Sequence, residues 1–311
     1  MGLSSKLFSR RLSWTKKGLL FEPVTSLWWM NSHAAAPTAN YIGEGIFRVY
    51  FSGRDNKNRS QIGWFDVKPN EGILEFIEYS KEPILENGEL GCFDDNGVTP
   101  SCVLDDENQK LLYFIGWNPG STVRMNIFGG VAISSNNGRT FERYSKAPII
   151  ERNRVNPYIN TSPFVLKDDD RWRMYYVAGV DWLNKDLPRY NIQYAESENG
   201  LEWKREGYVC IDFRNDNEVA LARPYVLKED GLYKMWFCHK GEDYRMGYAE
   251  SFDGRYWERK DEYAGLEPSE NGWDSEMVAY PCVFRHKDFY YMLYNGNNYG
   301  FGGVGYASSL F

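Results

Sequence analysis

The chain has 311 residues, a net charge of −7 and 17% aromatic residues. Its length supports a large hydrophobic core, and its acidic balance argues against a nucleic-acid or anionic-membrane partner. No apolar run approaches the length of a membrane span, and the basic residues 1–11 lack the apolar region of a signal peptide. We therefore expect a cytoplasmic protein without nucleic-acid or membrane partners.

The cysteines and histidines predict neither a disulfide framework nor a metal site. The five cysteines are odd in number and show no Cys-x-x-Cys spacing, and four lie in apolar runs typical of strands. They are expected to be buried thiols in a reducing compartment. His33 and His239 are possible metal ligands, but two dispersed histidines favour no metal site. No cofactor is predicted.

A polar or acidic loop, a proline and a short apolar strand recur through the sequence. The prolines of this pattern are Pro37, Pro100, Pro163, Pro224 and Pro281. Pro37 and Pro100 are 63 residues apart, and Pro224 and Pro281 are 57 residues apart. Five copies at a nearly constant period indicate a repeat architecture.

Each repeat reads as a four-stranded antiparallel unit. An aromatic-rich second strand, such as residues 172–177, follows the proline strand after a polar turn. A third strand then leads into an Asn-Gly or Asp-Gly turn, the strongest short hairpin signal. The fourth strand begins at the next aromatic residue, Phe141, Trp203 or Trp257. The other predicted second strands are residues 47–51, 111–115, 233–237 and 289–294.

The fifth repeat lacks a fourth strand, and the N-terminus supplies a candidate for it. The chain ends soon after residues 306–309, while residues 14–21 resemble residues 203–210 in their Trp and Gly positions. An N-terminal strand that completes the last unit would close the ring and remove its open sheet edges. The sequence therefore predicts an all-β, five-bladed β-propeller closed by the N-terminal strand, as one domain over residues 1–311. A linear solenoid is the alternative.

Acidic residues just before three of the prolines are the catalytic candidates. In a propeller these loops meet at the mouth of the central channel, and two carboxyl groups across a sugar suit glycosidic chemistry. We expect repulsion between them to raise at least one pKa. Asp95 is the preferred base, and Glu276 or Glu218 the preferred acid. The candidates are Asp94, Asp95, Glu218 and Glu276, with Asp274 nearby.

Polar and aromatic residues at the same strand ends are candidates for substrate binding. Trp117 and Trp182 would stack on sugar faces, and the polar residues would bind hydroxyl groups. As an alternative, the carboxylates cap turns or pair with arginines, and the tryptophans only pack. The set comprises Asn31, His33, Arg54, Asp55, Trp117, Asn160, Trp182, Arg223, His239 and Asn295.

The five repeats and their Ser-x-x-Asn/Asp-Gly-x-x-Trp/Phe hairpins resemble those of the five-bladed propeller glycosidases. That group includes the arabinanase- and xylosidase-like family 43, the invertase-like families 32 and 68, and the mannoside phosphorylases of family 130. The resemblance covers nearly the whole chain and implies the propeller fold and a saccharide or glycoside substrate.

The catalytic motifs differ from those families. Residues 29–33 match the start of the invertase Trp-Met-Asn-Asp signature, but Ser32 replaces the nucleophilic Asp. The invertase Arg-Asp-Pro motif is echoed only by Arg223-Pro224, and Ala36 stands where family 43-like enzymes carry the base.

The interpretations that follow are a glycoside hydrolase, a non-catalytic carbohydrate-binding propeller, or a family 130-like phosphorylase. The phosphorylase would use His33, Arg54, Arg223 and His239 as a phosphate cradle.

Overall fold

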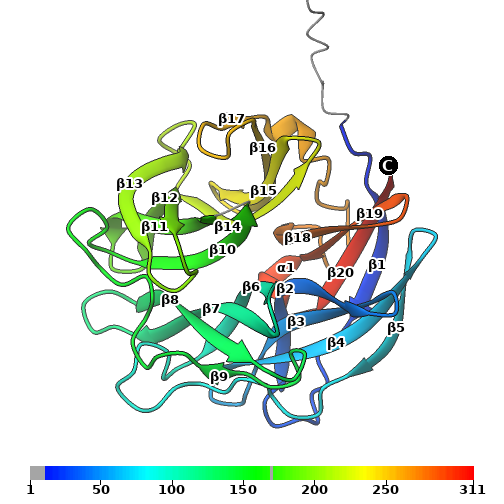
Figure 1. Ribbon diagram of the computed structural model, residues 1–311, viewed down its shortest axis with the longest axis horizontal. Coiled ribbons are helices and arrows are strands. Elements are labelled where there is room, and N and C mark those ends of the chain that lie inside the picture. The colour runs from blue at the N-terminus through cyan, green and yellow to red at the C-terminus, as the bar shows by residue number, and fades with distance from the viewer. Residues whose placement is uncertain (1–10, 169–170) are drawn as a thin grey trace, which may run out of the picture.

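The computed structural model describes residues 11–168 and 171–311, which form five antiparallel blades around a central axis (Figure 1). Blade 1 contains β2 (Ser32–Gly43), β3 (Ile46–Arg54), β4 (Ser60–Asn70) and β5 (Ile73–Tyr79). Blade 2 contains β6 (Val98–Asp106), β7 (Gln109–Pro119), β8 (Met125–Ser134) and β9 (Glu142–Arg143). Blade 3 contains β10 (Asn160–Asp168), β11 (Arg171–Asn184), β12 (Leu187–Ser197) and β13 (Lys204–Ile211). Blade 4 contains β14 (Ala220–Glu229), β15 (Leu232–Lys240), β16 (Tyr244–Ser251) and β17 (Glu258–Arg259).

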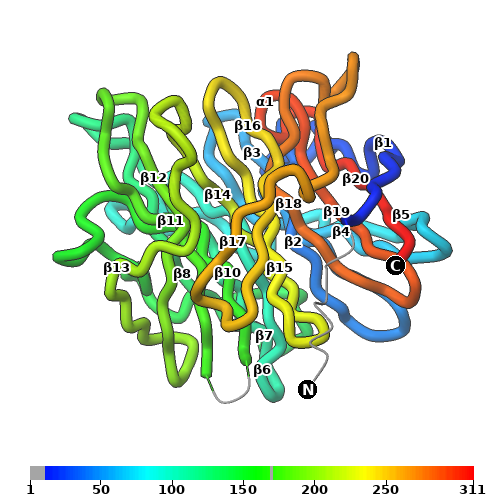
Figure 2. The backbone as a smooth tube through the Cα atoms, turned by 90° about the horizontal axis from the view of Figure 1, so that it is seen from above, coloured from blue at the N-terminus to red at the C-terminus, as the bar shows by residue number. Residues whose placement is uncertain are grey.

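Blade 5 combines the two ends of the described chain. It contains β18 (Ala279–His286), β19 (Phe289–Asn295), β20 (Val304–Leu310) and β1 (Thr15–Phe21). Strand β1 pairs with β20 from Thr15 opposite Ser308 to Phe21 opposite Val304. Figure 2 shows β1 and β20 side by side at one edge of the molecule. The predicted pairing of the N-terminal strand with the last blade is confirmed.

The predicted strands form because their alternating side chains fill the space between blades. The second strands carry large aromatic residues that are fully buried, among them Phe51, Phe114, Tyr176 and Trp236. Burial of one such side chain contributes roughly 1.5–3 kcal/mol. The fourth strands β9 and β17 have only two residues each and begin one residue after the predicted aromatic residues Phe141 and Trp257. Across the described residues, no helix is long and apolar enough to span a membrane.

The recurring proline marks a β-bulge in the innermost strand. In blade 3, Thr161 pairs with Val177 and Phe164 with Tyr175, so Ser162 and Pro163 together face one residue of β11. The register shifts in the same way between Ala222 and Tyr225 in blade 4 and between Ala279 and Cys282 in blade 5. A bulge bends the strand and re-aims a side chain.

The innermost strands begin, and the second strands end, on one face of the ring. This face also carries the single turn α1 (Asn297–Gly300), which lies at the upper edge in Figure 2. The short turn η1 (Asp261–Tyr263) follows β17. We call the face with α1 the mouth face; it is where the sequence predicts the site.

Candidate functional site

A ring of strained residues surrounds the axis at the bulges. The residues directly before four of the prolines are not glycine, yet they have positive φ: 56° at Ala36, 51° at Ser162, 53° at Arg223 and 60° at Tyr280. A residue before proline favours extended backbone, and positive φ is rare outside glycine. Strain of this kind is often concentrated at functional sites. We call these four residues the bulge ring.

The contacts of Arg223 show that a side chain of the bulge ring extends toward the axis. Its guanidinium donates to the carbonyl oxygen of Pro100 at 2.6 Å, in blade 2. It also donates to the carbonyls of Ala36 and Pro37 in blade 1, each at 3.3 Å. A side chain from blade 4 that reaches blades 1 and 2 must cross the axis. Arg223 is buried, and burial lowers its pKa.

Tyrosines from three blades gather above this ring. The hydroxyls of Tyr190 and Tyr244 are 2.6 Å apart. The Tyr244 ring lies 6.0 Å from that of Tyr280 and 6.1 Å from that of Tyr299. Lys240 Nζ donates to the Tyr299 hydroxyl at 3.0 Å. Burial raises the pKa of Tyr190 to about 12, so this phenol is protonated and is a hydrogen-bond donor at neutral pH.

Two arginines complete the cluster from blades 1 and 2. Arg54 ends β3, and Arg124 lies in the β7–β8 turn. Burial lowers the pKa of Arg54, and the positive charge of Arg124 adds to this effect while Tyr280 opposes it. Burial, with a contribution from Arg54, lowers the pKa of His33 to about 4, so His33 is neutral at pH 7. The mouth cluster is Arg54, Arg124, Tyr190, Tyr244, Tyr280 and Tyr299.

Asp94 does not face the axis in the way the sequence suggested. It is fully buried, and Arg143 of β9 donates to its Oδ2 at 2.7 Å. Gly88 and Gly116 lie so close that a Cβ at either position would meet Asp94 at 2.0 and 2.5 Å. The Asp94 carboxylate is therefore enclosed within its own blade, and its catalytic role stays a prediction.

Glu218 is held in a similar way. Arg259 of β17 donates to both of its carboxylate oxygens, at 2.6 and 2.7 Å, and His239 Nδ1 lies 3.2 Å from Oε1. Burial alone would raise the pKa of Glu218, but hydrogen bonds from Arg259 and His239 outweigh it and hold the pKa well below its usual range. Glu218 is therefore not a carboxylate whose pKa is raised by repulsion from its neighbours.

These ion pairs repeat around the ring. An acidic residue in the loop before the innermost strand pairs with a basic residue of the fourth strand of the same blade. The basic residue follows an aromatic residue by two positions, a signal that sequence reasoning missed. The pairs are Asp94–Arg143, Glu218–Arg259 and Asp274–Lys16, and the signals are Phe141-x-Arg143, Trp257-x-Arg259 and Trp14-x-Lys16.

The other two predicted carboxylates lie nearer the surface. Asp95 is half-buried, and its Oδ2 accepts from the backbone N–H of Gly91 at 2.9 Å. Glu276 is exposed; its backbone N–H donates to Asn297 at 2.8 Å, and its carbonyl accepts from Arg245 at 2.7 Å. Their catalytic role stays a prediction.

Several predicted substrate residues stabilise the mouth face. Trp117 Nε1 donates to Ser60 Oγ at 3.0 Å, which links blades 1 and 2. Asn295 is fully buried; its Oδ1 accepts from Ala36 N at 2.7 Å, and its Nδ2 donates to Ala34 O at 2.9 Å.

The remaining predicted residues are divided between the surface and the interior. Asp55 is buried and binds Arg59 in its own turn. Trp182 is half-buried on β11, and Asn31 is exposed. Asn160 is buried at the start of β10, where its Nδ2 donates to the carbonyl of Asn156 at 3.0 Å. Asp55 therefore stabilises its own turn, and its role in substrate binding stays a prediction.

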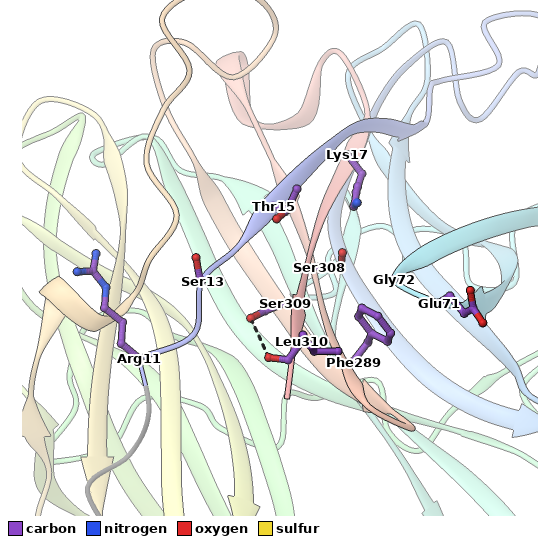
Figure 3. A pocket seen from close by; sticks show the side chains of 10 residues that line it. All are labelled: Arg11, Ser13, Thr15, Lys17, Glu71, Gly72, Phe289, Ser308, Ser309 and Leu310. Atoms are coloured by element: carbon purple, nitrogen blue, oxygen red, sulfur yellow. Dashed lines mark hydrogen bonds between the residues drawn. The ribbon is translucent and has the colours of Figure 1, made fainter.

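A cavity of about 300 Å³ lies away from the mouth cluster, at the seam between blades 5 and 1. Figure 3 shows Thr15 and Lys17 of β1 beside Ser308 and Ser309 of β20. The cavity lies at the end of the third strands, on the face opposite the mouth face. It is formed where the first and last strands of the ring meet blade 1. Within residues 11–168 and 171–311, no group of three or more His, Cys, Asp or Glu side chains is placed to hold a metal ion.

No protein-family model matches the chain. Uncharacterized proteins Rv1502 and MT1551, from two strains of Mycobacterium tuberculosis, are each 39% identical to it over 297 residues. Each match covers 95% of this chain and 99% of the relative. The chain belongs to the Rv1502 family. The similarity therefore extends over nearly the whole propeller rather than over a few blades.

Solved structures share the fold at low sequence identity. A complex of BT0996 with RGII has a TM-score of 0.75 and 18% identity, with 96% of this chain and 92% of the other covered. A thermostable family-43 glycoside hydrolase has a TM-score of 0.63 and 17% identity, with coverages of 89% and 88%. A structure from the family 130 of mannoside phosphorylases has a TM-score of 0.66 and 15% identity, with coverages of 96% and 90%. The fold is therefore that of the five-bladed propeller glycosidases, as the sequence predicted.

Proposed function

We propose that the protein acts on a glycoside at the mouth cluster and that Arg54 and Arg124 bind a carboxylate or phosphate group there. The positive charge of the cluster supports this proposal. Within the described residues, no carboxylate lies within ion-pair distance of Arg54, Arg124 or Lys240. A guanidinium binds a carboxylate or phosphate through two parallel hydrogen bonds.

The tyrosines give this site the properties of a saccharide surface. The exposed ring of Tyr299 and the half-buried ring of Tyr280 offer apolar faces, and the buried ring of Tyr244 packs against both. The Tyr190 and Tyr299 hydroxyls offer hydrogen bonds. Aromatic residues with a polar end suit ligands that are apolar on one face and polar at the rim. A sugar ring with an acidic or phosphorylated substituent has both features.

Phosphorolysis is a second candidate, favoured by the ion pairs of Asp94 and Glu218. Hydrolysis needs two carboxyl groups, one to protonate the leaving oxygen and one to activate water or attack the sugar. In phosphorolysis, phosphate supplies the attacking oxygen: the C1–O bond to the leaving group breaks, a C1–O–P bond forms, and one acid donates its proton. One free carboxyl group, Asp95 or Glu276, would then be enough.

The experiment is a screen of aryl glycosides and disaccharides with and without inorganic phosphate, using the full chain and the Arg54→Gln variant. Loss of a hydrogen bond to a charged group costs about 1.5–3 kcal/mol, so we expect kcat/KM to fall roughly 10- to 100-fold. Arg139→Gln, an exposed arginine in the β8–β9 turn on the opposite face, is the control and should change nothing.

The dependence on phosphate separates the two enzyme classes. Turnover that requires phosphate identifies phosphorolysis, and turnover without it identifies hydrolysis. Saccharide binding without turnover in either condition would identify a non-catalytic binding propeller and contradict the enzymatic proposal.

A further inference from the structure

Three consecutive side chains at the start of β10 have buried polar atoms without a protein partner. They are Asn160 Oδ1, Thr161 Oγ1 and Ser162 Oγ, and none has a hydrogen-bond partner among the described residues. Ser162 is 4% exposed, and Asn160 is fully buried. Buried polar atoms in native proteins are almost always hydrogen-bonded, and an unsatisfied one costs about 1–3 kcal/mol. At least one of these oxygens therefore faces a partner that is missing from the mouth end of blade 3.

The bulge ring defines the direction of Ser162. Arg223, at the equivalent position of blade 4, crosses the axis, and Tyr280, at the equivalent position of blade 5, joins the mouth cluster. Ser162 has nearly the same backbone conformation as both, with φ of 51° against 53° and 60°. Equivalent positions in a propeller are related by rotation about the axis, so the Ser162 hydroxyl points toward the same centre.

The ring is chemically uneven, as a recognition surface requires. Blade 1 contributes the methyl group of Ala36, blade 3 the hydroxyl of Ser162, blade 4 the guanidinium of Arg223 and blade 5 the phenol of Tyr280. A purely structural repeat would favour the same small residue at every position. The position one residue earlier is nearly uniform, as a structural repeat would be. It is alanine in blades 1, 4 and 5 and threonine in blade 3, at Ala35, Ala222, Ala279 and Thr161.

We propose, on the basis of the function proposed above, that Ser162 binds a hydroxyl group of the substrate's sugar ring. Arg54 and Arg124 hold the anionic group over blades 1 and 2, and the ring hydroxyls face blade 3. A serine hydroxyl both donates and accepts, which matches a sugar hydroxyl. The substrate class is therefore a sugar acid or sugar phosphate with free ring hydroxyls, and Ser162 is a specificity-determining residue.

The test measures binding of four probes by ligand-observed NMR titration of the full chain. The probes are D-galacturonate with its neutral counterpart D-galactose, and mannose 1-phosphate with its neutral counterpart D-mannose. In Ser162→Ala, we expect binding of the charged sugar and of its neutral counterpart to weaken by the same factor, roughly 2- to 10-fold. Thermal stability should stay unchanged or rise, because no protein partner is lost.

Thr161→Val is the matched control, since it removes an equally unpartnered hydroxyl one residue before the bulge. It should leave probe binding unchanged. If Ser162→Ala binds every probe as tightly as the wild type, or is destabilised in the way a lost protein hydrogen bond requires, the Ser162 inference is overturned.

Arg54→Gln separates this inference from the proposed function. That variant should reduce the preference for the charged sugars over their neutral counterparts, with Arg124 still in place. A wild type that binds charged and neutral sugars equally overturns the anionic site, whereas an effect of Arg54→Gln without one of Ser162→Ala overturns only the role of Ser162. Preference for galacturonate or for mannose 1-phosphate identifies the carboxylate or the phosphate as the bound group.

Discussion

Replacing Arg143 with methionine tests whether Asp94 is a structural residue of blade 2. Asp94 is fully enclosed, with 1% of its side chain exposed, while 21% of the Arg143 side chain is exposed. Removal of one partner of a buried ion pair leaves an uncompensated charge and costs about 3–5 kcal/mol. Because Arg143 borders solvent, which can partly replace it, we expect the lower end of that range, about 3 kcal/mol.

The assay is urea unfolding at pH 7, with the free energy of unfolding taken by linear extrapolation. Lys146→Met is the control: it breaks the Lys146–Glu89 pair, in which both side chains are 70% exposed, and should cost less than about 1 kcal/mol. The double variant Arg143→Met with Asp94→Asn should recover much of the loss, because the buried charge is gone.

The reasoning is refuted if Arg143→Met is as stable as the control. It is also refuted if Asp94→Asn alone abolishes glycoside turnover while stability stays at the wild-type value. That second result would assign Asp94 a catalytic role instead of a structural one.

Three further predictions address the pairing of β1 with β20, the cysteines and the response to acid. Deletion of residues 1–22 removes β1, so the exposed edge of β20 should cause aggregation; a truncated protein that unfolds as cooperatively as the full chain contradicts the role of β1. Titration of the denatured protein without reductant should count five thiols, and a count of three or one would reveal a disulfide. The pKa of His33 is about 4 in the folded protein and 6.5 for a free histidine. As the pH drops, the unfolded chain therefore takes up the proton first, and the free energy of unfolding should fall between about pH 6.5 and pH 4. His33→Gln should flatten that slope in thermal melts, and an unchanged slope assigns the acid response to other groups.

The fold was predictable because its signals are local and repeated. Each Asn-Gly or Asp-Gly hairpin identifies a third and a fourth strand by itself, and the regular spacing of the prolines places the innermost strands. The match between residues 14–21 and residues 203–210 was sufficient to predict a closure between strands at opposite ends of the chain.

The roles of the acidic residues were not predictable in the same way. Sequence spacing shows that Asp94 and Glu218 hold equivalent positions, but it does not show whether a side chain points to the axis or outward along its blade. That direction depends on partners 49 and 41 residues away, Arg143 and Arg259. Of the mouth cluster, only Arg54 was among the predicted residues. Tyr190 and Tyr244 lie near the start of third strands, whereas the candidates were taken from the loops before the innermost strands and from the ends of the second strands.

The pairing of β1 with β20 in blade 5 has a consequence for folding during synthesis. Thr15 and Ser308 pair although they are 293 positions apart in the sequence. Strand β1 is therefore synthesised before the other strands, and its partner strand β20 is synthesised after them. At about 5–20 residues per second, the interval on the ribosome is about 15 to 60 s. During that time four blades have their own strands available, while β1 presents unpaired backbone groups. We therefore expect the nascent chain to be most vulnerable to misassociation just before its final strand emerges, when only blade 5 is incomplete.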